Sequence, residues 1–221
     1  IIDKSLKQAQ ADVFYTEAVQ HFDKGQFELF FDNFFKAIHA RYDIEKPLIK
    51  RFMQRKLQII NKLKDKNKQL ERQLLEQREK MKTYADEYYA MGKICIESGD
   101  AKAALGNFDK AVSLYPLHVD AWIIKGVTLH DTSDFYQAEK CLNEAVRLSP
   151  LLFKAVFHRG ENRIALENYE GAISDLTKAI VLKKKHPKAH ELLGNAYSKI
   201  GDVVFAMRYW EKAQELEKRK R

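Results

Sequence analysis

The chain has 221 residues, of which 45% are hydrophobic and 32% are charged, and its formal net charge is +8. Helix-forming residues dominate, and there are nine glycines and four prolines, so the composition predicts an all-α protein. No stretch of 18 apolar residues occurs, which excludes a membrane-spanning helix.

Motifs of enzymes are missing from the sequence. It contains no P-loop, dinucleotide-binding or nucleophile-elbow pattern, and its cysteines and histidines lack the spacing of a nucleophilic pair. His186 and His190 are four residues apart, but Pro187 intervenes, so a solvated turn is expected there rather than a metal site. We therefore expect neither an enzyme nor a bound cofactor or metal.

The start of the sequence and its cysteines bear on where the protein works. It begins Ile1-Ile2-Asp3-Lys4, without an initiator methionine or a signal-peptide pattern, and is expected to be an internal part of a longer chain. Cys95 and Cys141 fall at unrelated positions in helical segments, which is typical of reduced packing residues. An intracellular, cytoplasmic protein is therefore expected.

Residues 1–46 are expected to form the first of three domains, a helical hairpin. Small and aromatic residues recur over 11–44, on both sides of a glycine: Phe14, Ala18, Gly25, Phe27, Phe34 and Ala37. Phe30, Phe31 and Phe35 add further bulk. An alternative interpretation is that these aromatic residues are simply the core of an irregular hairpin.

Residues 47–84 are expected to form a second domain, a long basic helix. Pro47 stands where a helix can begin, and residues 48–91 contain neither proline nor glycine, so the helix should continue to near Gly99. From Lys46 to Lys82 there are 13 basic and 4 acidic residues, against 26 basic and 27 acidic residues elsewhere. The whole positive excess therefore lies in this helix.

A heptad pattern runs along the long helix and predicts a coiled-coil face of Ile60, Leu63, Asn67, Leu70 and Leu74. Lys56 and Gln77 interrupt it, so a single charged helix that leans on the chain or on a partner is the alternative. The helix could meet a second copy or an acidic protein surface, with RNA and acidic lipid as further options. Specific nucleic-acid binding is not expected, because no nucleic-acid-binding fold accompanies the charge.

Residues 85–220 divide into four consecutive blocks of 34 residues: 85–118, 119–152, 153–186 and 187–220. Glycine recurs at the eighth position of each block and alanine at the twentieth and twenty-seventh. A turn is expected near the fifteenth residue, so each block should be a pair of helices that the small residues allow to pack closely. A fixed period of this length is typical of a solenoid.

This skeleton resembles the tetratricopeptide repeat (TPR) family. The best matches are Trp122, Gly126, Ala138, Ala145 and Pro150 in one block and Gly194, Tyr197, Ala206, Trp210 and Ala213 in another. The resemblance implies a right-handed solenoid of four repeats, and the hairpin over 11–44 can be read as a degenerate fifth copy. In the third block Arg159 and Arg163 replace the usual leucine and tyrosine, which predicts a more open or more polar first helix.

The resemblance also implies that the first helix of each repeat lines a concave groove for partner proteins. The residues expected there are Tyr89, Lys93, Ile96, Ile123, Val127, Phe157, Glu161, Ile164 and Asn195. One branch of the family binds acidic chaperone tails through lysines, arginines and asparagines at the fifth and ninth positions. Those slots hold Tyr89 and Lys93, Ile123 and Val127, Phe157 and Glu161, and Glu191 and Asn195, so that clamp is absent.

The sequence thus predicts a non-enzymatic scaffold or adaptor that captures a peptide or a helix of a partner in the groove. The alternative is a structural subunit of a large assembly, for example a cytoskeletal one, which oligomerises or docks through the basic helix. Residues 203–210 are apolar nearly all round, so a further helix, another subunit or a partner is expected to cover the last helix.

Overall fold

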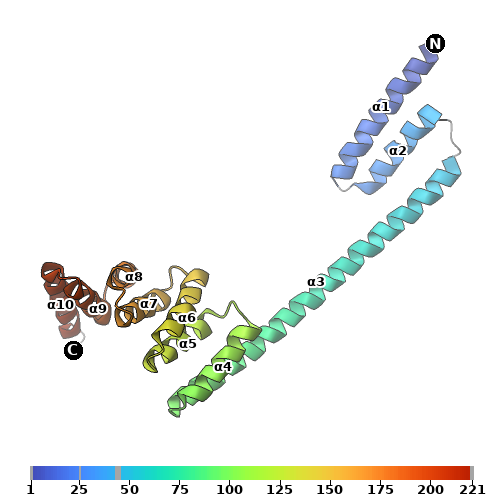
Figure 1. The fold of residues 1–221 in the computed structure, drawn as a ribbon. Helices are drawn as coiled ribbons and strands as arrows, with labels where there is room; N and C mark the ends of the chain where they lie inside the picture. Colours follow the sequence, from blue (N-terminus) through green and yellow to red (C-terminus); the bar gives the residue numbers. More distant parts are fainter. Residues whose placement is uncertain (1, 25, 43–45, 220–221) are drawn as a thin grey trace. The chain divides into compact units, whose positions relative to one another are not determined.

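The computed structural model describes residues 2–24, 26–42 and 46–219, and in this part of the chain it contains ten α-helices and no strand (Figure 1). The all-α prediction is therefore confirmed. The chain divides into two compact units, Ile1–Glu76 and Gln77–Arg221, and the boundary falls inside a helix. The division into three domains at residues 46 and 84 stays a prediction.

The first unit contains a helical hairpin, formed by α1 (Ile2–Asp23) and α2 (Phe27–Tyr42), which contact each other. Ala18 and Ala37 are buried, and the rings of Phe30 and Phe34 stack with their centroids 5.6 Å apart. The predicted hairpin is present. Its reading as a fifth repeat stays a prediction, and Gly25 and residues 43–44 of that copy lie outside the described residues.

Helix α3 runs from Lys46 to Glu97 and has 52 residues, which confirms the predicted long helix that ends near Gly99. On the predicted coiled-coil face, Leu63, Leu70 and Leu74 expose 55%, 51% and 51% of their surface. Asn67 is also exposed, and Ile60 is half-buried. Whether this face pairs with another helix stays a prediction.

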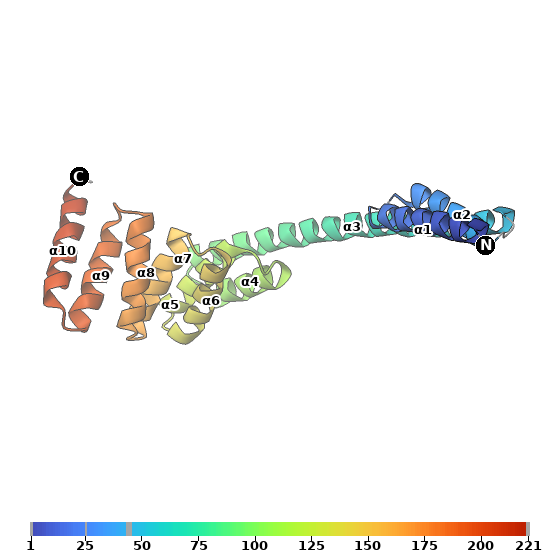
Figure 2. The same cartoon turned by 90° about the horizontal axis from the view of Figure 1, so that it is seen from above.

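The second unit consists of helical hairpins with the predicted period. The C-terminal part of α3 pairs with α4 (Ala101–Leu114), α5 (Val119–Asp131) with α6 (Phe135–Leu148), α7 (Phe153–Ala165) with α8 (Tyr169–Leu182), and α9 (Pro187–Lys199) with α10 (Val203–Lys218). Figure 2 shows α8, α9 and α10 side by side in a row. The unit is a solenoid in which each hairpin packs on the next.

The recurring glycine and alanine residues let the two helices of a hairpin approach closely. A Cβ atom added to Gly126 would lie 2.7 Å from Cγ of Leu142, and one added to Gly194 would lie 2.6 Å from Cδ1 of Trp210. These distances are too short for any side chain at the eighth position. The alanines at the twentieth position are all fully buried: Ala104, Ala138, Ala172 and Ala206.

The turn inside each hairpin uses one residue in the left-handed region, followed by a capping residue. The φ angles at the fifteenth position are 80° for Gly99, 64° for Ser133, 59° for Glu167 and 84° for Gly201. The next residue accepts a hydrogen bond from a backbone N–H of the second helix; these caps are Asp100, Asp134, Asn168 and Asp202. Two of the four turns therefore hold an L side chain in a conformation that favours glycine.

The helices of the solenoid lie in two layers. The first helices contact one another, α5 with α7 and α7 with α9, whereas each second helix contacts its own partner and the following first helix. Among the described residues, no two of the second helices make comparable contacts. Because the first helices lie closer together, they form the concave layer. Trp122 packs against three core clusters, which contain residues of the first, second and third repeats.

The third repeat is polar, as predicted, but it is not open. A Cβ atom on Gly160 would lie 2.9 Å from Cγ of Leu176, so α7 and α8 are as close as the other pairs. The guanidinium groups of Arg159 and Arg163 both pair with Asp175 of α8. Of the two predicted alternatives the structure shows the more polar helix, because these charges neutralise one another inside the repeat.

His190 also differs from the expectation of a solvated turn. It exposes only 6% of its surface, and its Nε2 lies 3.0 Å from the carbonyl oxygen of Lys184. His186 caps α9, because its Nδ1 accepts a hydrogen bond from the backbone N–H of Ala189. The two histidines therefore hold the junction between the third and fourth repeats.

Candidate partner-binding groove

The concave layer carries all nine residues predicted to line the groove, on α3, α5, α7 and α9. Seven of them are at least partly exposed: Tyr89, Lys93, Ile96, Val127, Glu161, Ile164 and Asn195. The other two, Ile123 and Phe157, expose only 5% and 6%. The predicted set therefore contains accessible side chains and side chains that belong to the core.

The two buried residues hold successive repeats together. Ile123 packs with Val146 and Val156, and thus with the third repeat. The ring of Phe157 lies 5.4 Å from that of Phe153 and 5.0 Å from that of His186, measured between centroids. Neither side chain is presented to a ligand to any large extent.

At its N-terminal end the groove presents a tyrosine beside a cation. The Nζ atom of Lys93 lies 5.6 Å from the ring centroid of Tyr89, and that ring lies 4.9 Å from the ring of His118. Burial, together with the nearby Asp120 carboxylate, raises the pKa of the Tyr89 phenol. The phenol therefore remains a neutral hydrogen-bond donor at neutral pH. Ile96, which is 38% exposed, adds an apolar contact.

At the C-terminal end the groove presents an amide. The Oδ1 atom of Asn195 accepts a hydrogen bond of 2.9 Å from Nε1 of Trp210. This bond fixes the orientation of the amide, so that its NH₂ group is the part that can donate to a ligand. Ile164 packs against the core cluster of the third and fourth repeats and is half-buried.

Between α5 and α7 the groove contains a cavity of about 90 Å³ with polar walls. It is lined by Val127, His130, Asp131, Leu142, His158 and Glu161. The Nδ1 atom of His158 lies 3.1 Å from Oε2 of Glu161. This hydrogen bond is the main reason why the pKa of the Glu161 carboxyl is below its usual value.

A buried amide connects this cavity to a polar network. The side chain of Asn162 is inaccessible; its Nδ2 donates to the carbonyl oxygen of Phe135 at 3.0 Å and to Oε2 of Glu139 at 3.1 Å. Its Oδ1 lies 3.1 Å from Nδ1 of His130. The buried Asn162 side chain therefore holds His130, which lines the cavity, through this hydrogen bond.

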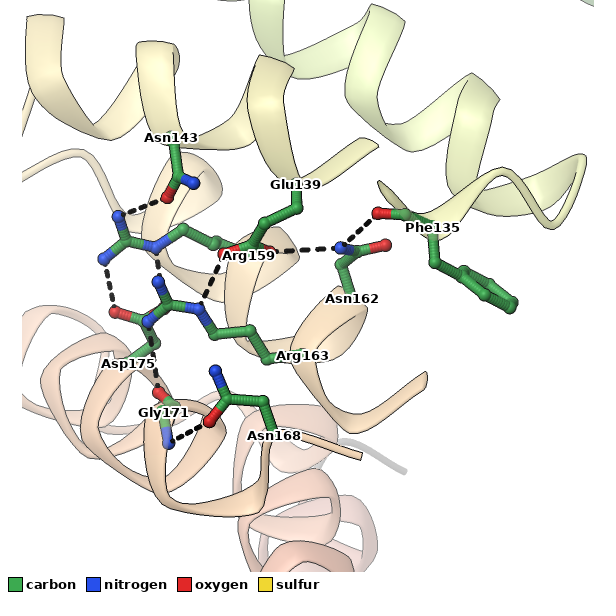
Figure 3. A network of polar contacts seen from close by, with 9 residues as sticks. All are labelled: Phe135, Glu139, Asn143, Arg159, Asn162, Arg163, Asn168, Gly171 and Asp175. Atoms are coloured by element: carbon green, nitrogen blue, oxygen red, sulfur yellow. Dashed lines mark hydrogen bonds and ion pairs between the residues drawn. The ribbon is translucent and has the colours of Figure 1, made fainter. Parts of the chain in front are cut away.

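Figure 3 shows how the network continues through two arginines of α7. Nε of Arg163 donates to Glu139 at 2.9 Å, and its Nη1 donates to Asp175 at 2.8 Å. Arg159 forms a bidentate ion pair with Asp175, in which Nε and Nη2 each donate to a carboxylate oxygen at 2.7 Å. Its Nη1 donates to Oδ1 of Asn143 at 3.1 Å. The network ties α6, α7 and α8 together directly beneath the groove.

The sequence did not indicate His158 as a residue of the cavity or Asn162 as a buried residue behind it. The other repeats carry Ile94, Thr128 and Ala196 at the tenth position, so an asparagine there was the available signal. His158 gave no such signal, because the sixth position is not among those that line the groove in this family.

Two further surfaces of the second unit are apolar. A hollow of about 420 Å³ is lined by Tyr84, Glu87, Tyr88, Met91 and Leu114. On the last helix, Val203, Val204, Phe205 and Met207 expose 58%, 79%, 42% and 54% of their surface. The apolar face predicted for the last helix is thus exposed in the isolated chain.

In the part of the chain that the structure describes, no three histidine, cysteine, aspartate or glutamate side chains are grouped so that they could hold a metal. Among the described helices, none combines the length and the apolar character needed to cross a membrane.

Comparison with known proteins agrees with the helical repeats. Residues 83–220 match the family model described as the bacterial transcriptional activator domain. Over 127 residues, 58% of the chain, the sequence is 28% identical to a BBSome complex member BBS4 homolog of Drosophila melanogaster, and the match covers 26% of that protein. The chain thus spans about a quarter of the length of this relative.

Solved structures show the same fold at low identity. A crystal structure of MamA superposes with a TM-score of 0.59 and 24% identity, covering 62% of this chain and 80% of the other. The first TPR of Spaghetti (RPAP3), bound to the HSP90 peptide SRMEEVD, superposes with a TM-score of 0.53 and 22% identity. The match covers 54% of this chain and 95% of the other. Both likenesses concern the fold.

Proposed function

The chain belongs to the bacterial transcriptional activator domain family and, by its four repeats, to the TPR proteins, and from this premise we propose that it is a non-enzymatic scaffold or adaptor. It captures a peptide or a helix of a partner protein in its concave groove. The main support is the layer of first helices, where seven of the nine predicted groove residues stay accessible between buried neighbours.

The chemistry of the groove favours an amphipathic helix or an extended apolar segment as the partner. Tyr89, Ile96 and Val127 offer apolar and aromatic contacts, and aromatic side chains contribute strongly at interfaces. At two of the slots where a chaperone-tail clamp needs cations or amides the chain has Glu161 and Glu191, which would repel an acidic tail. An acidic C-terminal tail is therefore not the proposed ligand.

Selection of binders from a random peptide display library tests this proposal with the full chain as bait. Peptides are expected to be enriched on the wild type and lost on a groove variant, Ile96→Asp combined with Val127→Asp. Tyr136→Asp is the matched control, because Tyr136 is 78% exposed on α6, outside the concave layer.

The control decides where the binding surface lies. Peptides that bind the groove variant as well as the wild type would place the surface elsewhere on the chain. Loss of binding in the Tyr136→Asp variant as well would indicate damage to the fold, and thermal unfolding of each variant separates that case.

A second candidate function is a structural subunit of a large assembly, and two observations favour it. The heptad positions Leu63, Leu70 and Leu74 of the basic helix are half exposed, and the relative in Drosophila is named as a member of a complex. In this role the helix pairs with a second copy or docks on an acidic protein surface.

Light scattering of the full chain tests the self-paired form of this role. A coiled coil predicts twice the chain mass of 25.8 kDa, and Leu70→Asp is expected to restore the single mass. Gln69→Asp is the matched control, because it adds the same charge one residue away from the heptad face. A single mass for the wild type at all concentrations would exclude self-pairing.

The last helix adds a partner requirement to either role. We propose that its exposed apolar face, centred on Val204 and Met207, is covered by a further helix, another subunit or a binding partner. The two cysteines are free, which suits the intracellular, cytoplasmic location proposed for the protein.

A further inference from the structure

The cavity between α5 and α7 has a polarity that can be worked out from the hydrogen bonds behind it. Both N–H groups of the Asn162 amide are used, towards the oxygens of Phe135 and Glu139. The orientation of this amide is therefore fixed, because the flipped amide would set its oxygen against two acceptors. The Oδ1 atom faces His130, so Nδ1 of His130 must carry the hydrogen.

The second histidine of the cavity, His158, also carries a hydrogen on Nδ1. Glu161 is ionised at neutral pH because its pKa is lowered, and a carboxylate can only accept hydrogen bonds. The hydrogen between His158 and Glu161 therefore lies on Nδ1 of the histidine. In the neutral form of either imidazole the remaining nitrogen, Nε2, is an acceptor.

The cavity brings two carboxylates together. Its polar lining consists of the carboxylates of Asp131 and Glu161 and the imidazoles of His130 and His158. Lys188, the lysine whose charge lowers the pKa of Glu161, is paired with Glu191 at 3.2 Å. Val127 and Leu142 supply an apolar wall.

We propose that this cavity binds the cationic head of an arginine or lysine side chain of the partner segment. A guanidinium or an ammonium group carries only donors and a positive charge, and thus complements the two carboxylates of the lining, Asp131 and Glu161. The volume of about 90 Å³ accommodates such a head. Val127 and Leu142 contact the methylene stem. The assignment rests on the proposed function, since the groove must hold a protein segment for such a side chain to reach the cavity.

Nuclear magnetic resonance of the full chain with labelled histidine tests the cavity without any partner. The chain has seven histidines, so the signals of His130 and His158 can be assigned by substitution. The probe is N-acetyl-arginine amide, and N-acetyl-citrulline amide is its uncharged counterpart of nearly the same shape. Arginine is expected to shift both histidines in a saturable way, with citrulline binding about tenfold more weakly. N-acetyl-lysine amide distinguishes the two cationic heads.

Variants separate a charge effect from a structural one. Asp131→Asn and Glu161→Gln are each expected to weaken arginine binding, and Asp131 is exposed, so its substitution should leave the fold intact. Glu170→Gln is the matched control, because Glu170 is exposed on α8 and does not line the cavity. Equal shifts with citrulline, unchanged binding in both variants, or no saturable shift would overturn the proposal. A groove that selects apolar peptides without a basic residue would overturn it too, while leaving the scaffold function in place.

Discussion

Glu167 lies in a backbone conformation that costs energy for any residue with a side chain. Its φ of 59° falls in the left-handed region, at a position where two of the other repeats have glycine. Strain of this kind destabilises the folded state by about 1–2 kcal/mol. Glycine removes the strain, but it lowers stability by about 0.5–1 kcal/mol because it increases the conformational entropy of the unfolded chain. We expect Glu167→Gly to stabilise the protein by about 0.5 kcal/mol, measured by urea unfolding.

Glu167→Ala is the control for this prediction. It removes the same carboxylate but keeps the side chain in the left-handed region, so its stability should stay close to that of the wild type. Equal effects of the glycine and alanine variants would indicate that charge, and not backbone strain, matters at this turn.

Glu161 should make stability depend on pH in the acid range. Its folded-state pKa is lowered from 4.5, first by the hydrogen bond from His158. A carboxyl with a depressed pKa contributes stability that is fully present above its unfolded value and is lost as the pH falls through the folded value. The contribution is therefore expected to vanish progressively below pH 4.5.

Urea unfolding at about pH 6 and about pH 3 measures this contribution. The wild type should lose more stability between the two conditions than Glu161→Gln, which cannot titrate. Glu211→Gln on the exposed side of α10 serves as the control. A variant that loses as much stability as the wild type would contradict the role assigned to the His158 hydrogen bond.

Phe157 shows why burial in the groove could not be predicted from the repeat register. The fifth position lies on the concave face in this family, and an accessible aromatic residue was expected there. In the structure the ring of His186, 29 residues further along the chain, lies 5.0 Å away and covers it. Whether a groove side chain is accessible depends on the neighbouring repeat, which the local pattern does not contain.

At the scale of elements, the helix pairs and turns of the second unit could be predicted because their causes are local. The eighth-position glycines and the caps such as Asp100 and Asp202 repeat every 34 residues. The network around Asp175 could not be predicted, because it joins three helices through charges that the sequence shows only as departures from the family pattern. Long-range pairing turned those departures into a compact repeat.

The network should be sensitive to the loss of its central carboxylate. Asp175 exposes 5% of its side chain and pairs with both Arg159 and Arg163. Asp175→Ala leaves two half-buried cations without this partner, so we expect a loss of about 3 kcal/mol in the free energy of unfolding. Chemical denaturation followed by circular dichroism measures it.

A double variant tests whether pairing, and not packing, is responsible. Arg159→Leu combined with Asp175→Leu removes one cation together with the carboxylate, while Arg163 keeps Glu139. The coupling energy of the two substitutions should exceed about 1 kcal/mol. Additive losses would mean that the two side chains act independently.

At the scale of the whole solenoid, each second helix except α10 is covered by the following repeat within the residues that the structure describes. The residue at the twenty-first position of each repeat shows the difference between the last repeat and the others. Leu105 packs into the cluster of the second repeat, Glu139 binds Arg163 of the third, and Ile173 packs against the fourth. The equivalent residue of α10, Met207, is 54% exposed.

Hydrogen exchange should therefore be faster in α10 than in α6 of the isolated chain. In a solenoid each repeat is stabilised mainly by its neighbours, and α10 has a neighbour on one side within the described residues. Mass spectrometry of exchanged peptides measures the difference. Slow exchange throughout 203–210 in a monomeric chain would contradict the need for a cover.

The placement of the two tryptophans gives the molecule a pair of built-in fluorescent reporters. Trp122 lies where the first two repeats meet, and its indole N–H donates a hydrogen bond of 2.9 Å to the carbonyl oxygen of Pro116. Trp210 lies in the last repeat, and its indole N–H donates a hydrogen bond to Oδ1 of Asn195. Variants that keep one indole and replace the other by phenylalanine would therefore report separately on the early and late repeats. Coincident denaturation curves would reveal one cooperative array, and separated curves would reveal melting that starts from one end.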